Sequence, residues 1–374
     1  MKERIVFIDL LRGWAALVMI EVHVLNAFLR PGEKQAYWFE VLNFVNGLVA
    51  PAFLFVAGLV FVVASERKLE EFRSFGSAFR KQVWRIFLIL VVGYVLHLPV
   101  FSFTTLLQVT GDGWGTFYQS DILHCIAAGL AVLFVFRLTV RDTRSLSALI
   151  GLVGLGVVLG APYLWQSDLV NAVHPAIAAY LSDKSGSLFP LFPWLGFLLF
   201  GGLVGIGYLQ AEHSGYEKGF GLCVLFSALV LLSFYGLQLL VTGPWFPGSR
   251  LQSDPLFFGM RLGLILLLLL LCRQWVRWRK TEKSFVLDAG RESLLVYVVH
   301  LTIIYGTFLG GRSLSEFYGG KLSIAEALVS TGLLMIMMIA VAKGWGRIKT
   351  HSRALSRGIV IAGSVIVTLF FFIQ

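Results

Sequence analysis

Charged residues are scarce in this sequence of 374 residues, where Asp, Glu, Lys and Arg together make up only 14%. Soluble domains contain about 25% charged residues, because they must present a polar surface to water. The composition therefore excludes an ordinary soluble globular protein. The chain also lacks a linker long enough to separate two folded domains, and it shows no internal repeat. We interpret residues 1–374 as one polytopic domain.

Cysteine, phosphate-binding loops and metal-ligand spacings are also rare or missing. The three cysteines, Cys125, Cys223 and Cys272, lie in apolar surroundings without paired spacing, which favours packed free thiols. No glycine-rich stretch has the strand-to-helix setting of a nucleotide site, and no histidines have the spacing of a zinc site. We therefore expect no bound metal. The first apolar stretch is interrupted by charges and has no small-residue cleavage pattern, so we expect no cleavable signal peptide.

Apolar runs dominate the sequence instead. Each is long enough to cross about 30 Å of hydrocarbon as a helix. A membrane β-barrel would show weakly alternating segments of about ten residues, and not continuous runs such as LGLILLLLLLC. The predicted fold class is therefore all-α, a transmembrane helical bundle. We predict eleven spans, near residues 5–29, 44–64, 86–101, 121–137, 146–166, 189–210, 219–242, 255–272, 292–309, 325–342 and 358–373.

The basic residues orient these predicted spans. With a cytoplasmic N-terminus, 23 of the 31 Lys and Arg residues fall on the cytoplasmic side, six fall outside and two lie within spans. Cytoplasmic segments of membrane proteins carry such an excess, so we predict a cytoplasmic N-terminus and an outer C-terminus. The formal net charge of +10 is then mainly an orientation signal with some attraction to anionic lipid headgroups. No nucleic-acid partner is needed to explain it.

The first predicted span carries four ionisable residues, Asp9, Arg12, Glu21 and His23. A charge at the bilayer centre costs about 3 kcal/mol, so such residues usually face a protein interior and mark a site. On a helix, Asp9, Arg12 and His23 fall within about 60° of one another, whereas Glu21 projects about 120° from Asp9. Arg12 and His23 are separated by about 16 Å along the axis. This face suits a ligand that enters near Arg12 and meets a partner near His23; the structural alternatives are a packing ion pair and a core histidine.

Two further predicted spans carry histidines. In YQSDILHC, Asp121 and His124 are three residues apart, on one helix face at about the depth of His23. Such a pair can form a base and its orienting carboxylate, although Asp121 is equally placed to be the helix N-cap. In GRESLLVYVVHLTIIYG, Tyr297 and His300 lie three residues apart inside the ninth span. A histidine there is a functional candidate, or else it bonds a neighbouring helix.

Other polar residues are weaker candidates. The remaining histidines lie mainly at membrane edges or in loops: His97, His174, His213 and His351. Basic residues between positions 66 and 85, including Arg80 and Arg85, could hold phosphate groups at the cytoplasmic side. A topological signal explains them equally well.

Several motifs occur in a fixed order: RIVFIDLLRGWAALVMIEVH, VAPAFLFVAGLVF, DILHCIAAGL, PLFPWLGFLLFGGLVG and GRESLLVYVVH. This ordered set, from the first to the ninth span, resembles the bacterial branch of the heparan-alpha-glucosaminide N-acetyltransferase-like membrane family. The spacing of Asp9, Arg12 and His23 also resembles the sister family that O-acylates bacterial surface polysaccharides and periplasmic glucans. That sister family is the alternative assignment.

The resemblance implies an acyltransferase of the bacterial cytoplasmic membrane. It would move an acetyl group from cytoplasmic acetyl-CoA, its cosubstrate, to a hydroxyl or amine of an envelope glycan or glycolipid. His124 or His23 would be the base or transient acyl acceptor, with Asp121 as orienting carboxylate and His300 in reserve. Four residues would contact CoA: Asp9, Arg12, Arg80 and Arg85. The stretch QAYWFEVLNF lacks the histidine of the lysosomal relatives, which leaves the base, and the choice between covalent and direct transfer, open.

Two other classes of protein compete with this interpretation. A transporter or flippase for a lipid-linked or anionic solute would also need intramembrane charges, but it would not consume acyl-CoA. A structural membrane subunit would tolerate loss of His23 and His124. The sequence leaves open the identity of the glycan, the length of the acyl chain and whether the chain forms a homo-oligomer.

Overall fold

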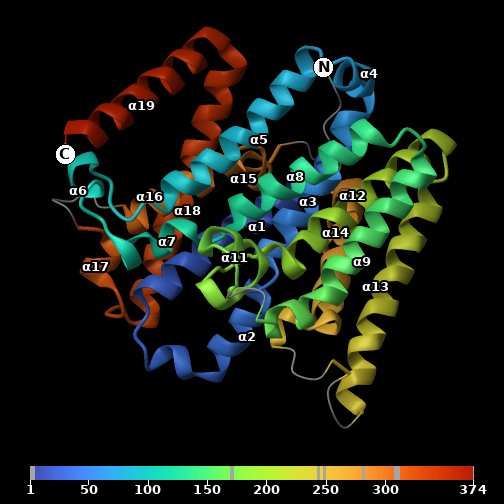
Figure 1. Ribbon diagram of the computed structural model, residues 1–374, viewed down its shortest axis with the longest axis horizontal. Helices are drawn as coiled ribbons and strands as arrows, with labels where there is room; N and C mark the ends of the chain where they lie inside the picture. The colour runs from blue at the N-terminus through green and yellow to red at the C-terminus, as the bar shows by residue number, and fades with distance from the viewer. Residues whose placement is uncertain are drawn as a thin grey trace. The chain divides into compact units, whose positions relative to one another are not determined.

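The computed structural model describes residues 5–168, 172–241, 245–246, 250–279, 283–306 and 312–373 (Figure 1). These residues form α-helices and short 3-10 helices joined by loops. Within the described ranges, extended pairing is limited to an isolated bridge between Leu29 and Leu322. The predicted all-α fold class is confirmed.

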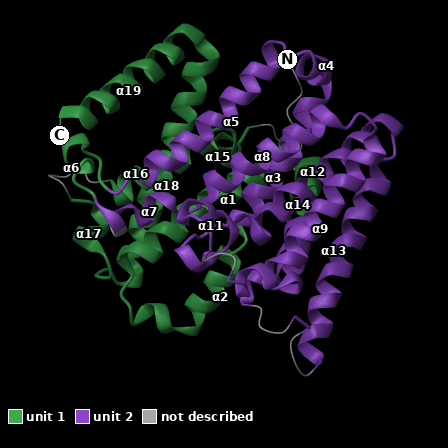
Figure 2. Ribbon diagram, in the orientation of Figure 1, with its two compact units in different colours: residues 1–49, 100–109, 271–374 green, residues 50–99, 110–270 purple. Residues whose placement is uncertain are grey.

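The chain packs as two compact units, each assembled from separate stretches of sequence (Figure 2). Unit 1 comprises residues 1–49, 100–109 and 271–374, and unit 2 comprises residues 50–99 and 110–270. The single domain predicted for residues 1–374 stays a prediction.

Unit 1 contains the first long helix and the last helices of the chain. Within it, α1 packs against α15, α16 and α18. The helices of this unit are α1 (Val6–Phe28), η1 (Glu33–Gln35), α2 (Tyr37–Asn46), α6 (Phe103–Leu106), α15 (Phe285–Arg291), α16 (Ser293–Tyr305), α17 (Leu314–Tyr318), α18 (Ile324–His351) and α19 (Arg353–Ile373).

Unit 2 contains most of the middle of the chain. Within it, α12 packs against α8 and α9, and α5 packs against α8. Its helices are α3 (Val49–Ser65), η2 (Glu66–Lys68), α4 (Leu69–Arg73), α5 (Ser77–Leu96), η3 (Gly111–Trp114), α7 (Gly115–Tyr118), α8 (Ile122–Thr139), α9 (Thr143–Gln166), α11 (Pro175–Leu181), η4 (Asp183–Ser185), α12 (Leu191–Ser214), α13 (Glu217–Leu240), η5 (Leu251–Ser253) and α14 (Pro255–Arg279), of which α14 continues into unit 1.

Eight helical segments among the described residues are long and apolar enough to cross a membrane, so the chain is a multi-pass membrane protein. They are Tyr37–Arg73, Gly115–Thr139, Thr143–Gln166, Leu191–Ser214, Glu217–Leu240, Pro255–Arg279, Ile324–His351 and Arg353–Ile373. Each overlaps one of the eleven predicted spans.

The other three predicted spans are 5–29, 86–101 and 292–309. They correspond to α1 and α5, which carry charged side chains, and to α16, which has only 13 residues. The count of eleven spans and the cytoplasmic N-terminus stay predictions. The predicted span ends at 242 and 309 lie outside the described residues.

Polar side chains set the starts of several helices. The Asp142 carboxylate accepts the backbone N–H of Ser145 at 2.7 Å at the start of α9. At the start of α18, Ser323 and Glu326 form a capping box, in which the Ser323 N–H donates to Glu326 Oε2 at 2.8 Å. Each such cap satisfies backbone donors that the helix leaves unpaired and stabilises it by about 1 kcal/mol.

A small apolar core anchors the C-terminal end of α1 in unit 1. Leu25, Leu29, Phe39 and Ala327 are buried together, with residues of α2 and α18 packed around them. The backbone pairing beside this core joins the end of α1 to the segment before α18, because the Leu322 N–H donates to the Phe28 carbonyl at 2.9 Å. These contacts hold the part of α1 that carries His23.

Candidate functional site

The N-terminal part of α1 and the helix α15 together carry a cluster of arginines and carboxylates in unit 1. Nη2 of Arg12 lies 2.9 Å from Oδ1 of Asp9, and Nε of Arg12 donates to the carbonyl oxygen of Gly290 on α15. Nε of Arg291, the next residue on α15, lies 3.7 Å from Oδ2 of Asp9. Asp9 is buried. Arg291 also faces a second carboxylate, because its Nη1 lies 3.9 Å from Oδ1 of Asp288. The two guanidinium groups therefore share the buried carboxylate of Asp9, and Arg291 has Asp288 as a further partner.

Gly290 allows the helices α1 and α15 to approach closely at this cluster. A Cβ atom at position 290 would lie 2.1 Å from the carbonyl oxygen of Asp9. Real Cβ atoms do not come so near a backbone oxygen, so any other residue would push the helices apart. The absence of a side chain thus brings the Gly290 carbonyl within reach of Arg12.

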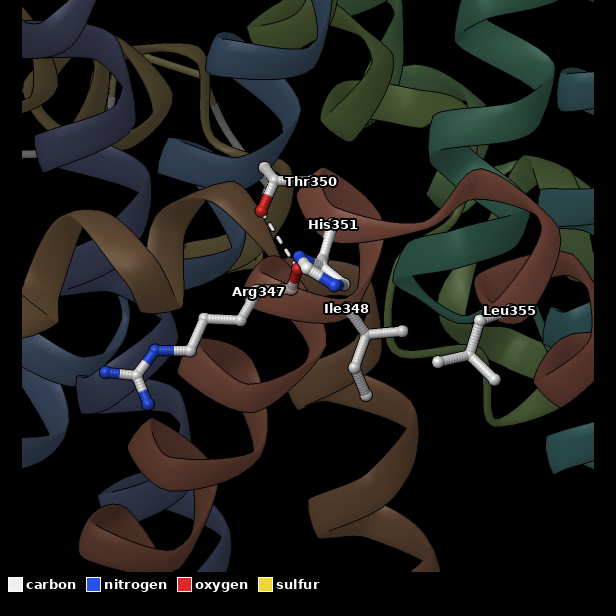
Figure 3. A pocket seen from close by; sticks show the side chains of 5 residues that line it. All are labelled: Arg347, Ile348, Thr350, His351 and Leu355. Atoms are coloured by element: carbon white, nitrogen blue, oxygen red, sulfur yellow. Dashed lines mark hydrogen bonds between the residues drawn. The ribbon is translucent and has the colours of Figure 1, made fainter.

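The C-terminal part of α18 adds basic residues in the same unit. Nζ of Lys349 lies 2.6 Å from Oε2 of Glu292, the residue that follows Arg291. The neighbouring turns of α18 and the start of α19 form an open pocket of about 510 Å³ (Figure 3). Within its lining, the Thr350 hydroxyl donates a hydrogen bond to the Arg347 carbonyl oxygen. The pocket is lined by Arg347, Ile348, Thr350, His351 and Leu355.

The C-terminal half of α1 carries a different chemistry. The ring of His23 lies 5.2 Å, between centroids, from the ring of His300 on α16, and 6.0 Å from the ring of Tyr305. His300 is fully buried, and its Nδ1 lies 2.7 Å from the carbonyl oxygen of Val296. A carbonyl oxygen can only accept a hydrogen bond, so Nδ1 carries the proton and Nε2 carries the lone pair. Within the described part of the chain, Nε2 of His300 has no hydrogen-bond partner.

Unit 2 contains a second histidine cluster, at the start of α8. Asp121 is the N-cap residue and forms a capping box with His124, whose Nδ1 accepts the Asp121 backbone N–H at 3.2 Å. The Asp121 carboxylate also faces His97, whose Nε2 lies 3.5 Å from Oδ2. Nδ1 of His97 lies 3.2 Å from the carbonyl oxygen of Thr116. Because both ring nitrogens of His97 face acceptors, the ring is an imidazolium in this geometry.

The electrostatics of His97 agree with that assignment. His97 follows the last residue of α5 and lies outside the eight candidate spans. Burial disfavours its charged form, but the hydrogen bond and charge of Asp121 and the Thr116 carbonyl outweigh burial, so the pKa of His97 is raised above its ordinary value of 6.5. The Asp121 carboxylate is therefore the counterion of His97.

Aromatic side chains surround His124. The ring of Tyr94 lies 4.3 Å from the ring of His124, and that of Tyr180 lies 6.3 Å away. The hydroxyl groups of Tyr94 and Tyr180 are 3.0 Å apart and hydrogen-bonded. A Cβ at Gly93 would lie between 3.1 and 3.3 Å from three atoms of the His124 ring, so glycine leaves room for the ring against α5.

The structure thus places the predicted site residues in separate groups. Asp9 pairs with Arg12, and His23 lies beside His300, as two groups within unit 1. In unit 2, Asp121 and His124 are joined by the capping box. The two remaining candidates, Arg80 and Arg85, are exposed on α5. Their roles in binding CoA stay predictions.

Sequence reasoning set aside or missed several residues of these groups. His97 was a weak candidate, yet it pairs with Asp121. The signal was available, because consecutive spans are antiparallel, and the end of the span at 86–101 therefore faces the start of the span at 121–137. Tyr94, Tyr180 and the Arg291 contact to Asp9 had no comparable signal. Glu21, predicted to lie off the Asp9 face, accepts a hydrogen bond from Asn46 at 3.3 Å.

Among the described residues, no three His, Cys, Asp or Glu side chains are grouped so that they could hold a metal ion. The buried ionisable groups instead comprise an arginine–carboxylate cluster and two histidine clusters, within a set of apolar helices. This combination defines a multi-pass membrane protein with polar sites inside its helical units.

The family of this membrane protein follows from comparison with known families. The model of the family described as heparan-alpha-glucosaminide N-acetyltransferase, catalytic, matches residues 4–239. The match covers more than half of the chain, so the protein belongs to this family of membrane acetyltransferases, as the motifs predicted. No individually curated protein matches the chain. His300 and Arg291 lie beyond the matched residues.

Proposed function

We propose that this protein transfers an acetyl group from acetyl-CoA to a hydroxyl or amine of an envelope glycan or glycolipid, in the cytoplasmic membrane of a bacterium. One observation carries the proposal. In unit 1, a single helix, α1, has an arginine cluster near its start and a pair of histidines near its end. Arg12 and His23 are about 16 Å apart along the helix axis. An acyl donor with an anionic head group and a long arm that carries the acyl group would fit this distance, with its anionic head at the arginines and its acyl group at the histidines.

The arginine cluster suits the phosphate groups of CoA. Guanidinium groups bind phosphate through paired N–H donors. Asp9 contacts both Arg12 and Arg291, and Asp288 contacts Arg291, so carboxylates orient both guanidinium groups. Arg347 and His351 line the pocket in the same unit and add basic groups for the nucleotide end of the donor. The acetyl thioester would then extend along α1 toward His23.

The histidine pair suits the transfer step. The Nε2 lone pair of His300 accepts the proton of the acceptor hydroxyl or amine while the acceptor oxygen or nitrogen attacks the acyl carbon. A carbon–oxygen or carbon–nitrogen bond forms, the carbon–sulfur bond breaks, and the CoA thiolate leaves and takes up the proton from His300. Val296 holds the ring so that Nε2 is the atom available for this role. We therefore favour direct transfer, with His300 as the base.

A transfer assay tests this proposal. The purified protein in detergent is given acetyl-CoA labelled in the acetyl group with ¹⁴C, together with glucosamine as an amine acceptor or glucose as a hydroxyl acceptor. We expect release of free CoA thiol and an equal amount of labelled sugar. Preference for glucosamine would support an N-acetyltransferase, and preference for glucose would support the sister O-acyltransferase alternative. Absence of both products, with movement of labelled solute across proteoliposomes, would favour a transporter instead.

A further inference from the structure

Positive charge is concentrated where α18 ends and α19 begins, within unit 1. Residues 327–374 contain no Asp or Glu, whereas five Lys and Arg residues and one histidine fall between positions 343 and 357. Lys349 pairs with Glu292, whose Oε2 lies 2.6 Å from Nζ. The other basic side chains of this turn have no carboxylate partner among the described residues. The turn therefore carries an excess of positive charge.

Two of these basic residues, Arg347 and His351, line the open pocket of about 510 Å³. They are four residues apart, so they project from α18 within about 40° of each other. Lys349 projects about 160° away from both, toward Glu292. Glu292 therefore does not neutralise the basic groups of the pocket. Both Arg347 and His351 are exposed, so a ligand can reach them without any movement of the chain.

The same pocket also has an apolar part. Ile348 of α18 and Leu355 of α19 lie in its lining, and the side chain of Arg347 extends away from Leu355 (Figure 3). The Thr350 hydroxyl already donates to the Arg347 carbonyl oxygen at 2.9 Å. The pocket thus combines an apolar wall with a basic edge. This combination suits a ligand in which an anionic group is joined to an apolar part.

The helix α19 extends from this pocket as an apolar helix that the protein leaves uncovered. None of its side chains is buried, and apolar residues along it, such as Ile361 and Ile366, are exposed. Near its end, the ring of Phe372 lies 4.8 Å from the ring of Phe103 in the same unit. An apolar helix of this length in a multi-pass membrane protein is covered by lipid acyl chains. The pocket therefore lies at one end of a surface that lipid covers.

The position of the pocket along the chain places it at the level of the lipid phosphates. The helices α18 and α19 are consecutive, and both are long and apolar enough to cross a membrane. With both helices across the bilayer, the turn between them lies where the bilayer meets water. Guanidinium groups bind phosphate there through paired N–H donors, and basic pockets between membrane helices bind anionic headgroups.

We propose that this pocket binds the headgroup of an anionic phospholipid, with the phosphate at Arg347 and His351 and the acyl chains along α19. The nucleotide phosphates of acetyl-CoA offer the same chemistry to the basic groups, but acetyl-CoA has no long acyl chains to cover α19. The experiment below separates these two sources of phosphate. The inference does not depend on the proposed acetyl transfer.

Native mass spectrometry of the protein in detergent tests the proposal. The protein is titrated with phosphatidylglycerol, which is anionic, or with phosphatidylcholine, which is zwitterionic, and we expect tighter binding of phosphatidylglycerol. Arg347→Gln should weaken that binding about fivefold, the factor that one basic residue contributes near an anionic lipid surface. Arg357→Gln removes the same charge from an exposed position outside the pocket lining and should bind like the wild type. The melting temperature of each lipid-free variant checks its folding.

Three results would overturn the proposal. Equal affinity of the wild type for the two lipids would show that the protein does not select an anionic headgroup. Equal weakening by Arg347→Gln and Arg357→Gln would show an effect of general surface charge. Weaker binding of acetyl-CoA by Arg347→Gln, with unchanged binding of phosphatidylglycerol, would assign the pocket to the acyl donor. If the wild type transfers no acetyl group but its affinity for phosphatidylglycerol depends on Arg347, the proposed function fails and this inference stands.

Discussion

The carboxylate of Asp121 lies 3.5 Å from Nε2 of His97, while the backbone N–H of the same Asp121 donates to Nδ1 of His124 at 3.2 Å. One residue at the start of α8 therefore holds two histidines in different states within unit 2. His97 is charged because both of its nitrogens face acceptors, and His124 is neutral with a defined tautomer. This arrangement gives the cluster a pH dependence that can be measured.

Thermal stability should decrease as the pH rises through the raised pKa of His97. The ion pair with Asp121 contributes fully below about pH 6.5, where the ring is charged in both the folded and the unfolded chain, and its contribution is lost above the folded pKa. The melting temperature in detergent is compared between about pH 6 and pH 9 for the wild type and for His97→Gln. The decrease should be smaller in the variant. An equal decrease in melting temperature in the wild type and in His97→Gln would show that other groups cause the pH dependence.

Substitution of His300 should abolish transfer without unfolding the protein. His300→Gln keeps much of the side-chain volume but cannot take up a proton, so we expect kcat to fall by about 100-fold to 10,000-fold. His213→Gln is a matched control, because Nδ1 of His213 also lies 2.7 Å from the carbonyl oxygen four residues earlier, but on an exposed surface. Near-normal transfer by His300→Gln would remove it as the base.

Direct transfer makes a further prediction about the protein itself. After incubation with ¹⁴C-labelled acetyl-CoA and no acceptor, acid-quenched protein should carry no stable label. In direct transfer the acyl carbon bonds only to the acceptor, and the Nε2 atom of His300 takes only a proton. Stoichiometric label that is lost in His300→Gln or in His23→Gln would identify an acyl-histidine and a covalent route.

Acetyl-CoA should stabilise the folded protein through Arg12 and Arg291. A ligand that binds only the folded state adds about 2.7 kcal/mol at a hundredfold excess over Kd, which appears as a rise in melting temperature. We expect a smaller rise in Arg12→Ala, in which Asp9 keeps Arg291 as a partner. Arg357→Ala, an exposed position on α19, is the control and should respond like the wild type. The same rise in all three proteins would place the donor site elsewhere.

Gly290→Ala should destabilise unit 1 by about 1 to 3 kcal/mol or prevent folding, because the added Cβ would lie 2.1 Å from the Asp9 carbonyl oxygen. Gly358→Ala on α19 is the matched control, since a Cβ there meets nothing within 4 Å. Alanine is the better helix former, so the control should be stabilised by about 0.5 to 1 kcal/mol. Equal melting temperatures for both variants would contradict the close approach of α1 and α15.

Local spacing predicted part of the sites correctly. Asp9 and Arg12 are one helical turn apart, so their ion pair follows from the sequence once α1 is helical. The same holds for Asp121 as the N-cap of α8, because N-cap preferences are local. The neighbours of these residues were not predictable in this way. Arg291 reaches Asp9, and His97 reaches Asp121, only because different helices pack together.

Some of the membrane spans could also be predicted from the local sequence, and others could not. The eight segments with continuous apolar character were found from hydropathy, because that property depends only on the local composition. The predicted spans at 5–29, 86–101 and 292–309 did not meet the same measure of length and apolar character within the described residues. Their helices carry charged residues or are short, and their surroundings come from other helices, which local composition does not describe.

By itself, the sequence determined the helical class, the membrane character, the family and the positions of ionisable residues along each helix. Those properties depend on residue type and on spacing within one helix. The tertiary structure alone decided which side chains meet, and with that the chemistry of the histidines. The protonation of one imidazole nitrogen depends on which backbone group binds the other nitrogen. Only the folded chain therefore leaves a lone pair on Nε2 of His300 and a proton on Nε2 of His124.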